Sequence, residues 1–249
     1  MSLTALAGII LVVFSAILLI GLYMLKDRVN ASFRSIPAFT KFIRSIGTAV
    51  EQGTRVHFSL GSADIVRERT GASFVGLSAV RHITELAGAS DNPPMTTSGD
   101  PALAVLAQDN LHTAYRVAGL EEQYRPDTGR MTGLTPFSYA AGTLPMIADE
   151  DVSSSFVAGG FGVEIGLITE AIERQDAFTL SAADSLPAQA LVYASAKEPL
   201  IGEELFATGA YLESGRAHMA SLYVQDILRW LIVLILLGGA AMKLLAGLI

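Results

Sequence analysis

The sequence predicts an α/β domain with a mostly parallel, Rossmann-like sheet in three layers, flanked by an N-terminal and a C-terminal transmembrane helix. Three observations support this prediction. Apolar stretches occupy both ends of the 249-residue chain, short β-rich runs alternate with helical runs between them, and turns containing glycine or proline separate these runs. Alternating strands and helices are typical of β-α units, whose strands lie parallel and are covered by helices on both faces.

The first apolar stretch, Thr4 to Leu25, contains 22 residues and no charged side chain. At 1.5 Å per residue, a helix of this length crosses the roughly 30 Å hydrocarbon layer of a bilayer. The stretch lacks the basic start and the small-residue cleavage site of a signal peptide, and Lys26 follows it directly. We therefore predict a retained transmembrane helix over residues 1–25.

A change in charge follows this stretch. Residues 26–44 carry five basic side chains and one acidic one, whereas residues 47–225 carry ten basic and 22 acidic side chains. We interpret residues 26–46 as a basic juxtamembrane stalk and 47–225 as an acidic cytoplasmic α/β domain. Basic residues beside a span stay on the cytoplasmic side, which predicts a domain on the inner face of a bacterial cytoplasmic membrane. The acidic domain disfavours nucleic acid as a partner.

The middle of the chain contains strands and helices in alternation. Predicted strands are short and rich in β-branched or aromatic residues, and predicted helices repeat apolar residues every three or four positions, as Phe74, Leu77, Val80 and Ile83 do. The strands are predicted at 55–60, 94–97, 130–135, 153–158 and 177–182. The helices are predicted at 71–86, 102–117, 137–148, 163–174, 187–194 and 202–212. A final helical run, 216–230, continues without a breaker into the C-terminal span.

The second apolar stretch, Trp230 to Ile249, contains one charge, Lys243, and we place its transmembrane helix at residues 226–249. Lys243 lies 14 residues after Arg229, about 21 Å along a helix, so its side chain can reach the far headgroups. We interpret Lys243 as a depth anchor, with an ion relay in an oligomer as the alternative. The residues predicted to anchor the chain at the membrane are Lys26, Arg28, Arg229, Trp230 and Lys243.

Composition excludes several kinds of chemistry. The chain has no cysteine, so disulfides, thiolate nucleophiles, cysteine zinc sites and iron–sulfur clusters are excluded. The four histidines form neither an i, i+4 pair nor an HExxH motif, and the acidic runs 149–151 and 203–204 lack the spacing of a calcium loop. No GxSxG nucleophile motif is present. The sequence therefore identifies no catalytic residue, no metal site and no cofactor.

Three turns are candidates for binding a small ligand. In the first, Gly159, Gly160, Phe161 and Gly162 precede a helix that begins near Glu164, where backbone amides suit an anion. The pattern is not GxGxxG and lacks a lysine, so a tight turn is the simpler interpretation. The second and third turns are Ser98-Gly99-Asp100 and Ser138-Tyr139. The simpler interpretation is again structural, since Asp100 suits a helix cap and small residues near Tyr139 suit close helix packing.

Ligands of open α/β sheets bind at the carboxyl ends of the strands, so the three turns are expected to meet at one edge as a cleft. The candidate ligand-binding residues are Ser98, Gly99, Asp100, Ser138, Tyr139, Gly159, Gly160, Gly162 and Glu164.

Several runs resemble a known family. These are the runs at 90–94, 99–101, 106–109, 137–142, 160–164, 201–212 and 221–230. Together they resemble an uncharacterised family of bacterial membrane proteins, catalogued as a domain of unknown function, with a span, a soluble α/β domain and a terminal span. The resemblance implies this architecture and no activity.

Two functions remain open at this point. The favoured one is a membrane-anchored structural or assembly protein, whose partners are the lipid bilayer, further copies of the chain and other membrane proteins. Two tethers restrict the rotation of the domain, which lowers the entropy cost of association in the membrane plane. The alternative is a membrane-tethered sensor or enzyme with a cleft for an anionic or nucleotide-like molecule. Binding is favoured over catalysis because no catalytic constellation is evident.

Overall fold

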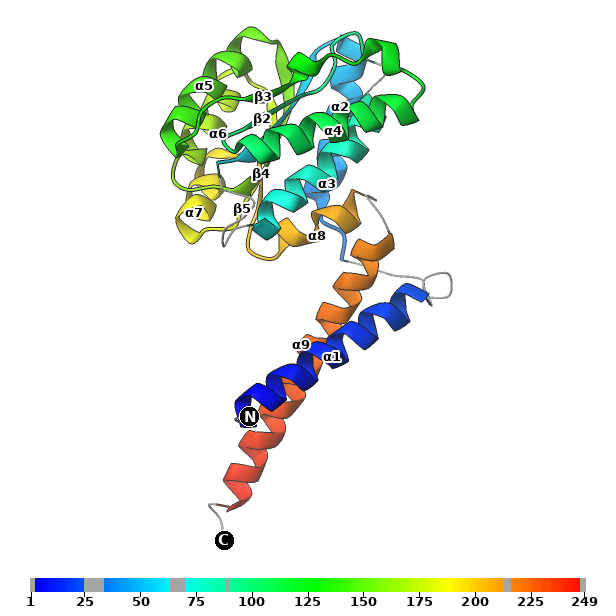
Figure 1. Cartoon of the computed structure of the whole chain (residues 1–249). Helices are drawn as coiled ribbons and strands as arrows, with labels where there is room; N and C mark the ends of the chain where they lie inside the picture. Colours follow the sequence, from blue (N-terminus) through cyan, green and yellow to red (C-terminus); the bar gives the residue numbers. More distant parts are fainter. Residues whose placement is uncertain (1–2, 25–33, 63–69, 88–89, 213–215, 247–249) are drawn as a thin grey trace. The chain divides into compact units, whose positions relative to one another are not determined.

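The computed structural model divides the chain into two compact units, an α/β unit over Arg34–Ser214 and a helical unit formed by both ends of the chain. The described residues are 3–24, 34–62, 70–87, 90–212 and 216–246 (Figure 1).

A six-stranded sheet forms the centre of the α/β unit, and all of its strands are parallel. The strands are β1 (Arg55–Gly61), β2 (Met95–Ser98), β3 (Gly129–Met131), β4 (Val152–Gly160), β5 (Phe178–Ala183) and β6 (Glu198–Leu200). Their spatial order is β3-β2-β1-β4-β5-β6, the order of doubly wound nucleotide-binding folds. The predicted parallel α/β sheet is therefore confirmed, and the strand order reverses between β1 and β4.

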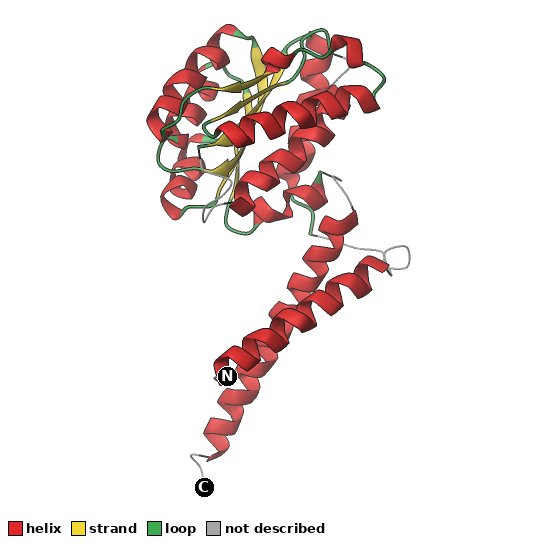
Figure 2. Cartoon of the chain, in the orientation of Figure 1, coloured by secondary structure: helices red, strands yellow, loops and turns green. Residues whose placement is uncertain are grey.

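Helices cover both faces of the sheet (Figure 2). The helices of this unit are α2 (Pro37–Gln52), α3 (Thr70–Ala87), α4 (Pro101–Val117), α5 (Pro136–Asp149), α6 (Ile165–Arg174), α7 (Leu186–Ser195) and α8 (Glu204–Tyr211), with 3₁₀ turns η1 (Glu121–Gln123) and η2 (Pro126–Thr128). One apolar cluster joins the sheet to α2, α3, α4 and α8, and a second joins it to α5, α6 and α7. The unit is a three-layer sandwich, as predicted.

The two faces of the sheet bury different side chains. On β1, Val56, Phe58 and Leu60 point to the face covered by α2 and α3, where they belong to the larger apolar cluster. His57 and Ser59 alternate with them and therefore point to the face covered by α5 and α6. Every residue of β1 is buried, as expected for a central strand with helices on both faces.

Most predicted elements are confirmed, with corrections at their ends. The strand predicted at 130–135 is shorter, since β3 ends at Met131, and the strand predicted at 153–158 is longer, since β4 includes Gly159 and Gly160. Phe74 is 49% exposed, so it does not belong to the buried face of α3. Two elements were not predicted from the sequence. These are β6, which has only three residues, and α2.

Helix α2 changes the interpretation of the segment predicted as a stalk. Residues 37–46 of that segment are the first part of α2, whose Phe39, Phe42 and Ile46 are buried against the sheet. Phe42 stacks on Phe156 of β4 at a centroid distance of 5.5 Å. The predicted boundary at residue 46 therefore lies inside a core helix. The spacing of Phe39, Phe42 and Ile46 by three or four positions is typical of a helix with one buried face.

The helical unit contains α1 (Leu3–Met24) and α9 (Arg216–Ala246), which pack against each other. As predicted, α9 continues without interruption from residue 216 into the apolar C-terminal stretch. Its Met219–Leu244 portion is long and apolar enough to cross a membrane and is not buried inside the structure. Helix α1 is weaker evidence for a membrane span, because its continuous apolar part, Gly8–Met24, is shorter than the corresponding part of α9.

Candidate functional site

The carboxyl ends of β4, β1 and β2 meet through backbone contacts. The Ser62 N–H donates to the Gly160 carbonyl at 3.2 Å, and the Gly99 N–H donates to the Gly61 carbonyl at 2.9 Å. A Cβ atom on Gly159 would lie 2.1 Å from the Leu60 carbonyl oxygen, so only glycine allows β4 to approach β1 this closely. The structure therefore brings the first two predicted turns together where the strand order reverses.

In the first turn, the chain supplies its own anion. Glu164 directly precedes α6, is 1% exposed, and its Oε1 accepts hydrogen bonds from the Ser62 hydroxyl and the Gly162 N–H, both at 2.9 Å. A carboxylate at a helix N-terminus is favourable because backbone amides and the helix dipole are positive there. The Glu164 carboxylate thus binds the Gly162 amide that a phosphate would use.

The second turn caps a helix. Asp100 accepts a hydrogen bond from the Leu103 N–H at 2.8 Å, and the Ser98 hydroxyl donates to the Asp100 carbonyl at 3.2 Å. Gly99 is buried between them and lies close to the backbone of Ser62. The capping role that the sequence suggested for Asp100 is therefore the one that the structure shows.

The third turn separates its two predicted residues. Ser138 is exposed and forms a capping box with Thr135 at the start of α5. Tyr139 is fully buried, and its hydroxyl lies 2.6 Å from the Ser59 hydroxyl beneath the helix layer. Tyr139 therefore points at the sheet beside the last residues of β1 and β2, whereas Ser138 lies on the surface.

Tyr139 belongs to a buried chain of hydrogen bonds that was not predicted from the sequence. His57 Nδ1 lies 3.0 Å from the Ser155 hydroxyl, and His57 Nε2 lies 2.9 Å from the Thr97 hydroxyl. The Thr97 hydroxyl lies 3.3 Å from the Tyr139 hydroxyl, which continues to Ser59. The available signal was the alternation of His57 and Ser59 with apolar residues on β1, which marks a polar face.

Burial controls the ionisation of this chain. Desolvation lowers the pKa of His57 from 6.5 to about 3, so the imidazole is neutral at pH 7. Desolvation also raises the pKa of the Tyr139 phenol, and the hydrogen bonds to Ser59 and Thr97 partly oppose that rise. All groups of the chain are thus uncharged at neutral pH, and all lie away from solvent.

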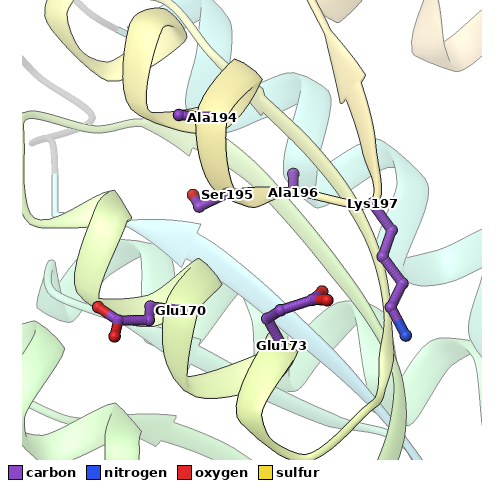
Figure 3. Close-up of a pocket in the computed structure, with 6 residues that line it drawn as sticks. All are labelled: Glu170, Glu173, Ala194, Ser195, Ala196 and Lys197. Carbon is purple, nitrogen blue, oxygen red and sulfur yellow. The ribbon is translucent and has the colours of Figure 1, made fainter.

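An open pocket lies where α6 and α7 end, at the opposite edge of the sheet (Figure 3). The hydroxyl of Ser195, which lines the pocket, lies 2.6 Å from the Thr169 hydroxyl. The Lys197 ammonium forms an ion pair of 2.8 Å with Asp176. The residues that line the pocket are Glu170, Glu173, Ala194, Ser195, Ala196 and Lys197. No predicted site residue lies in this pocket.

Of the predicted membrane-anchoring residues, three lie on α9. Arg229 forms an ion pair of 3.3 Å with Asp226, and Trp230 beside it is 68% exposed. Lys243 lies in the last turn of the helix, where a basic side chain is favourable. Lys26 and Arg28 fall outside the described residues. Within the described ranges, no group of three or more His, Asp or Glu side chains is placed to hold a metal ion.

Comparison with known proteins assigns the family. A family model described as "Domain of unknown function (DUF6754)" matches residues 2–249. The chain belongs to this family. The resemblance to an uncharacterised family is therefore confirmed, and the match covers both apolar ends as well as the α/β unit. No curated protein and no solved structure matches the chain.

Proposed function

We propose that this DUF6754 protein is a membrane-anchored assembly protein, whose α/β domains associate with one another while α1 and α9 hold each copy in a bilayer. The observation that carries the proposal is the exposed apolar helix α9, in a chain whose α/β unit uses the predicted site residues in structural roles. Asp100 and Ser138 cap helices, and Glu164 closes a turn.

Contacts within the α/β unit hold its two chain ends together. The Tyr211 hydroxyl donates to the Arg34 carbonyl at 2.5 Å, and the Arg34 guanidinium forms an ion pair of 2.5 Å with Glu204. The Phe39 ring stacks on the Tyr211 ring at 5.0 Å with an interplanar angle of 7°. Because the chain enters and leaves the unit at one place, both apolar helices can insert into the same membrane.

The proposed location is a bacterial cytoplasmic membrane, with the domain in the cytoplasm. Lys26 and Arg28 directly follow the first apolar stretch and Arg229 directly precedes the second, which fits the preference of basic residues for the cytoplasmic face. The proposed partners are lipid, further copies of the chain, and other membrane proteins that bind through the same apolar helices. Nucleic acid is not a proposed partner, because the domain is acidic.

Exposed apolar side chains at the carboxyl edge support association between copies. Phe137 in the first turn of α5 is 60% exposed, Leu186 at the start of α7 is 79% exposed, and Val163 before α6 is 51% exposed. They occupy similar positions in three successive strand-to-helix connections. If the side chains of further copies cover them, their exposed apolar area is removed from water on association.

Mass measurement of the full chain in detergent tests the proposal. We expect an oligomer at micromolar concentration, and we expect Phe137→Asp with Leu186→Asp to lower its mass. The control is Val117→Asp, which changes a side chain that is 61% exposed at the last residue of α4. We expect this variant to leave the mass unchanged. A monomeric wild-type chain would contradict the assembly proposal, and release of the chain by a salt wash would contradict the membrane anchor.

A second candidate function is binding of a small ligand at the carboxyl edge. The observation that favours it is the reversal of strand order between β1 and β4, the place where doubly wound folds bind ligands. A thermal-shift panel of nucleotides and metabolites tests it, since a ligand at 100 times its Kd adds about 2.7 kcal/mol of stability. The Glu164 carboxylate at this edge predicts weak or no response to anions.

A further inference from the structure

Two buried hydroxyls on β5 lack any hydrogen-bond partner in the described part of the chain. They belong to Thr179 and Ser181, both 0% exposed. The two residues are separated by one position, so they point to the same face of the sheet, which is the polar face beneath α6 and α7. A buried hydroxyl without a partner costs about 1–3 kcal/mol, which makes two adjacent ones a feature that needs a physical cause.

The register places these hydroxyls beside the buried hydrogen-bond chain. Thr179 of β5 is directly opposite Ser155 of β4, and Ser155 is the end of the chain that runs through His57. Side chains of directly paired residues have Cβ atoms about 5 Å apart, and residues i and i+2 on one strand are about 6.5–7 Å apart. Both separations suit a bridge by one small molecule with hydrogen bonds of about 2.8 Å on each side.

The chemistry of the neighbouring side chains indicates which small molecule forms the bridge. A serine or threonine hydroxyl both donates and accepts, and a molecule that bridges several of them must do the same. Complete burial limits its size, and the neutral His57 leaves no charge in the chain to attract an ion. Buried water needs two to four polar partners, and the pairs Ser155–Thr179 and Thr179–Ser181 each supply two.

We propose that ordered water binds on this face between β4, β5 and the α6–α7 layer, and extends the hydrogen-bond chain of Ser59, Tyr139, Thr97, His57 and Ser155 to Thr179 and Ser181. One water bridges Ser155 and Thr179, and a second bridges Thr179 and Ser181. The other orphan hydroxyls do not share this setting. Thr84 on α3, for example, belongs to the helix layer on the opposite face of the sheet, beside the buried apolar residues Val80 and Ile83.

The isosteric variant Thr179→Val tests the proposal in the full chain in detergent, through urea unfolding. If water binds there, loss of the hydroxyl breaks its hydrogen bonds, and the equilibrium constant for folding falls about tenfold. If the hydroxyl is dry and unpaired, valine raises that constant. A rise with Thr179→Val and with Ser181→Ala would therefore overturn the proposal.

A direct count of water provides the second measurement. Water ¹⁷O relaxation dispersion of the full chain reports long-lived internal waters, and we expect Thr179→Val to remove at least one of them. The matched control is Thr84→Val, which we expect to leave the count unchanged. An unchanged count in Thr179→Val would overturn the proposal even where the variant is less stable than the wild type, because loss of stability alone has other causes.

Discussion

The face of the sheet covered by α2, α3, α4 and α8 buries aromatic and aliphatic side chains, whereas the face covered by α5, α6 and α7 buries a histidine and several hydroxyls. On the first face, Phe42, Phe58 and Phe156 form an aromatic group with centroid distances of 5.5 and 6.4 Å. On the second face, His57 occupies the central strand, with a hydroxyl on either side.

The comparison separates two ways of stabilising one sheet. Burial of apolar area contributes about 25 cal/mol per Å² and needs no particular partner for each atom. Buried polar groups contribute little net free energy when they are paired, and they are costly when one partner is removed. The first face therefore supplies most of the stability, and the second face requires each polar group to keep its partner.

The largest expected effect is on the apolar face. Phe42→Ala removes a ring that is 0% exposed and stacked on Phe156 and Phe178, and it leaves a cavity. We expect a loss of about 3–5 kcal/mol in the free energy of unfolding. Urea unfolding of the full chain in detergent measures it. The control Val105→Ala, at a side chain that is 64% exposed, should change stability by less than about 0.5 kcal/mol.

This result also tests the assignment of α2 to the core. If residues 37–46 were a stalk outside the domain, Phe42→Ala would behave like the exposed control. A loss below about 1 kcal/mol would therefore remove α2 from the apolar face and leave that face uncovered over β4 and β5.

The second effect is a pH dependence that belongs to the polar face. The pKa of His57 is about 3 in the folded chain and 6.5 in the unfolded chain, so the unfolded chain binds the extra proton between these values. Stability is complete above pH 6.5 and falls as the pH is lowered towards 3. Between pH 7 and pH 5 the expected loss is about 2 kcal/mol, from a slope of about 1.4 kcal/mol per pH unit.

A histidine variant isolates this effect. His57→Gln keeps an amide that can bond to the neighbouring hydroxyls but does not titrate, so the loss between pH 7 and pH 5 should largely vanish. Val105→Ala is the control, because that side chain is 64% exposed and carries no titratable group, so the slope should stay intact. Equal slopes in the wild type and His57→Gln would show that His57 is not the buried neutral group.

Sequence patterns predicted the apolar face better than the polar one. Residues 153–158 and 177–182 were recognised as strands because such runs are β-rich, and the parallel sheet followed from their alternation with helices. The partners of His57 could not be predicted, because Thr97 and Ser155 lie 40 and 98 positions away in the sequence and meet only through the strand order. Strand order is a property of the packed fold.

Only part of the candidate site could be predicted, because some of its contacts join segments that are distant in sequence. Local signals were sufficient for Asp100 and for the glycines at the end of β4, where a helix cap and a glycine turn can be recognised from adjacent residues. They were insufficient for Glu164, whose bond to Ser62 joins two connections 102 positions apart. They also failed for Tyr139, because the sequence did not show which side of α5 faces the sheet.

A smaller effect is expected from the hydroxyl of Tyr139. Tyr139→Phe keeps the buried ring and removes a hydroxyl that lies 2.6 Å from Ser59, which leaves polar groups of Ser59 and Thr97 without this partner. We expect a loss of about 1–2 kcal/mol in the free energy of unfolding. Tyr193→Phe is the control, because Tyr193 is 73% exposed and its hydroxyl can bond to water. Equal stabilities of the two variants would disprove the buried chain.

The smallest expected effect is a change in the free energy of unfolding whose sign differs between the two faces of the sheet. Thr84 on α3 is 1% exposed and its hydroxyl has no partner in the described structure, so Thr84→Val should stabilise the chain by up to about 1 kcal/mol. Thr169 on α6 is equally buried, but its hydroxyl bonds to Ser195 at 2.6 Å, so Thr169→Val should destabilise by about 1 kcal/mol. Both substitutions are isosteric and both lie in helices, so propensity and volume cancel between them. Unfolding midpoints that shift in the same direction would show that pairing of the hydroxyl does not distinguish the two helix layers.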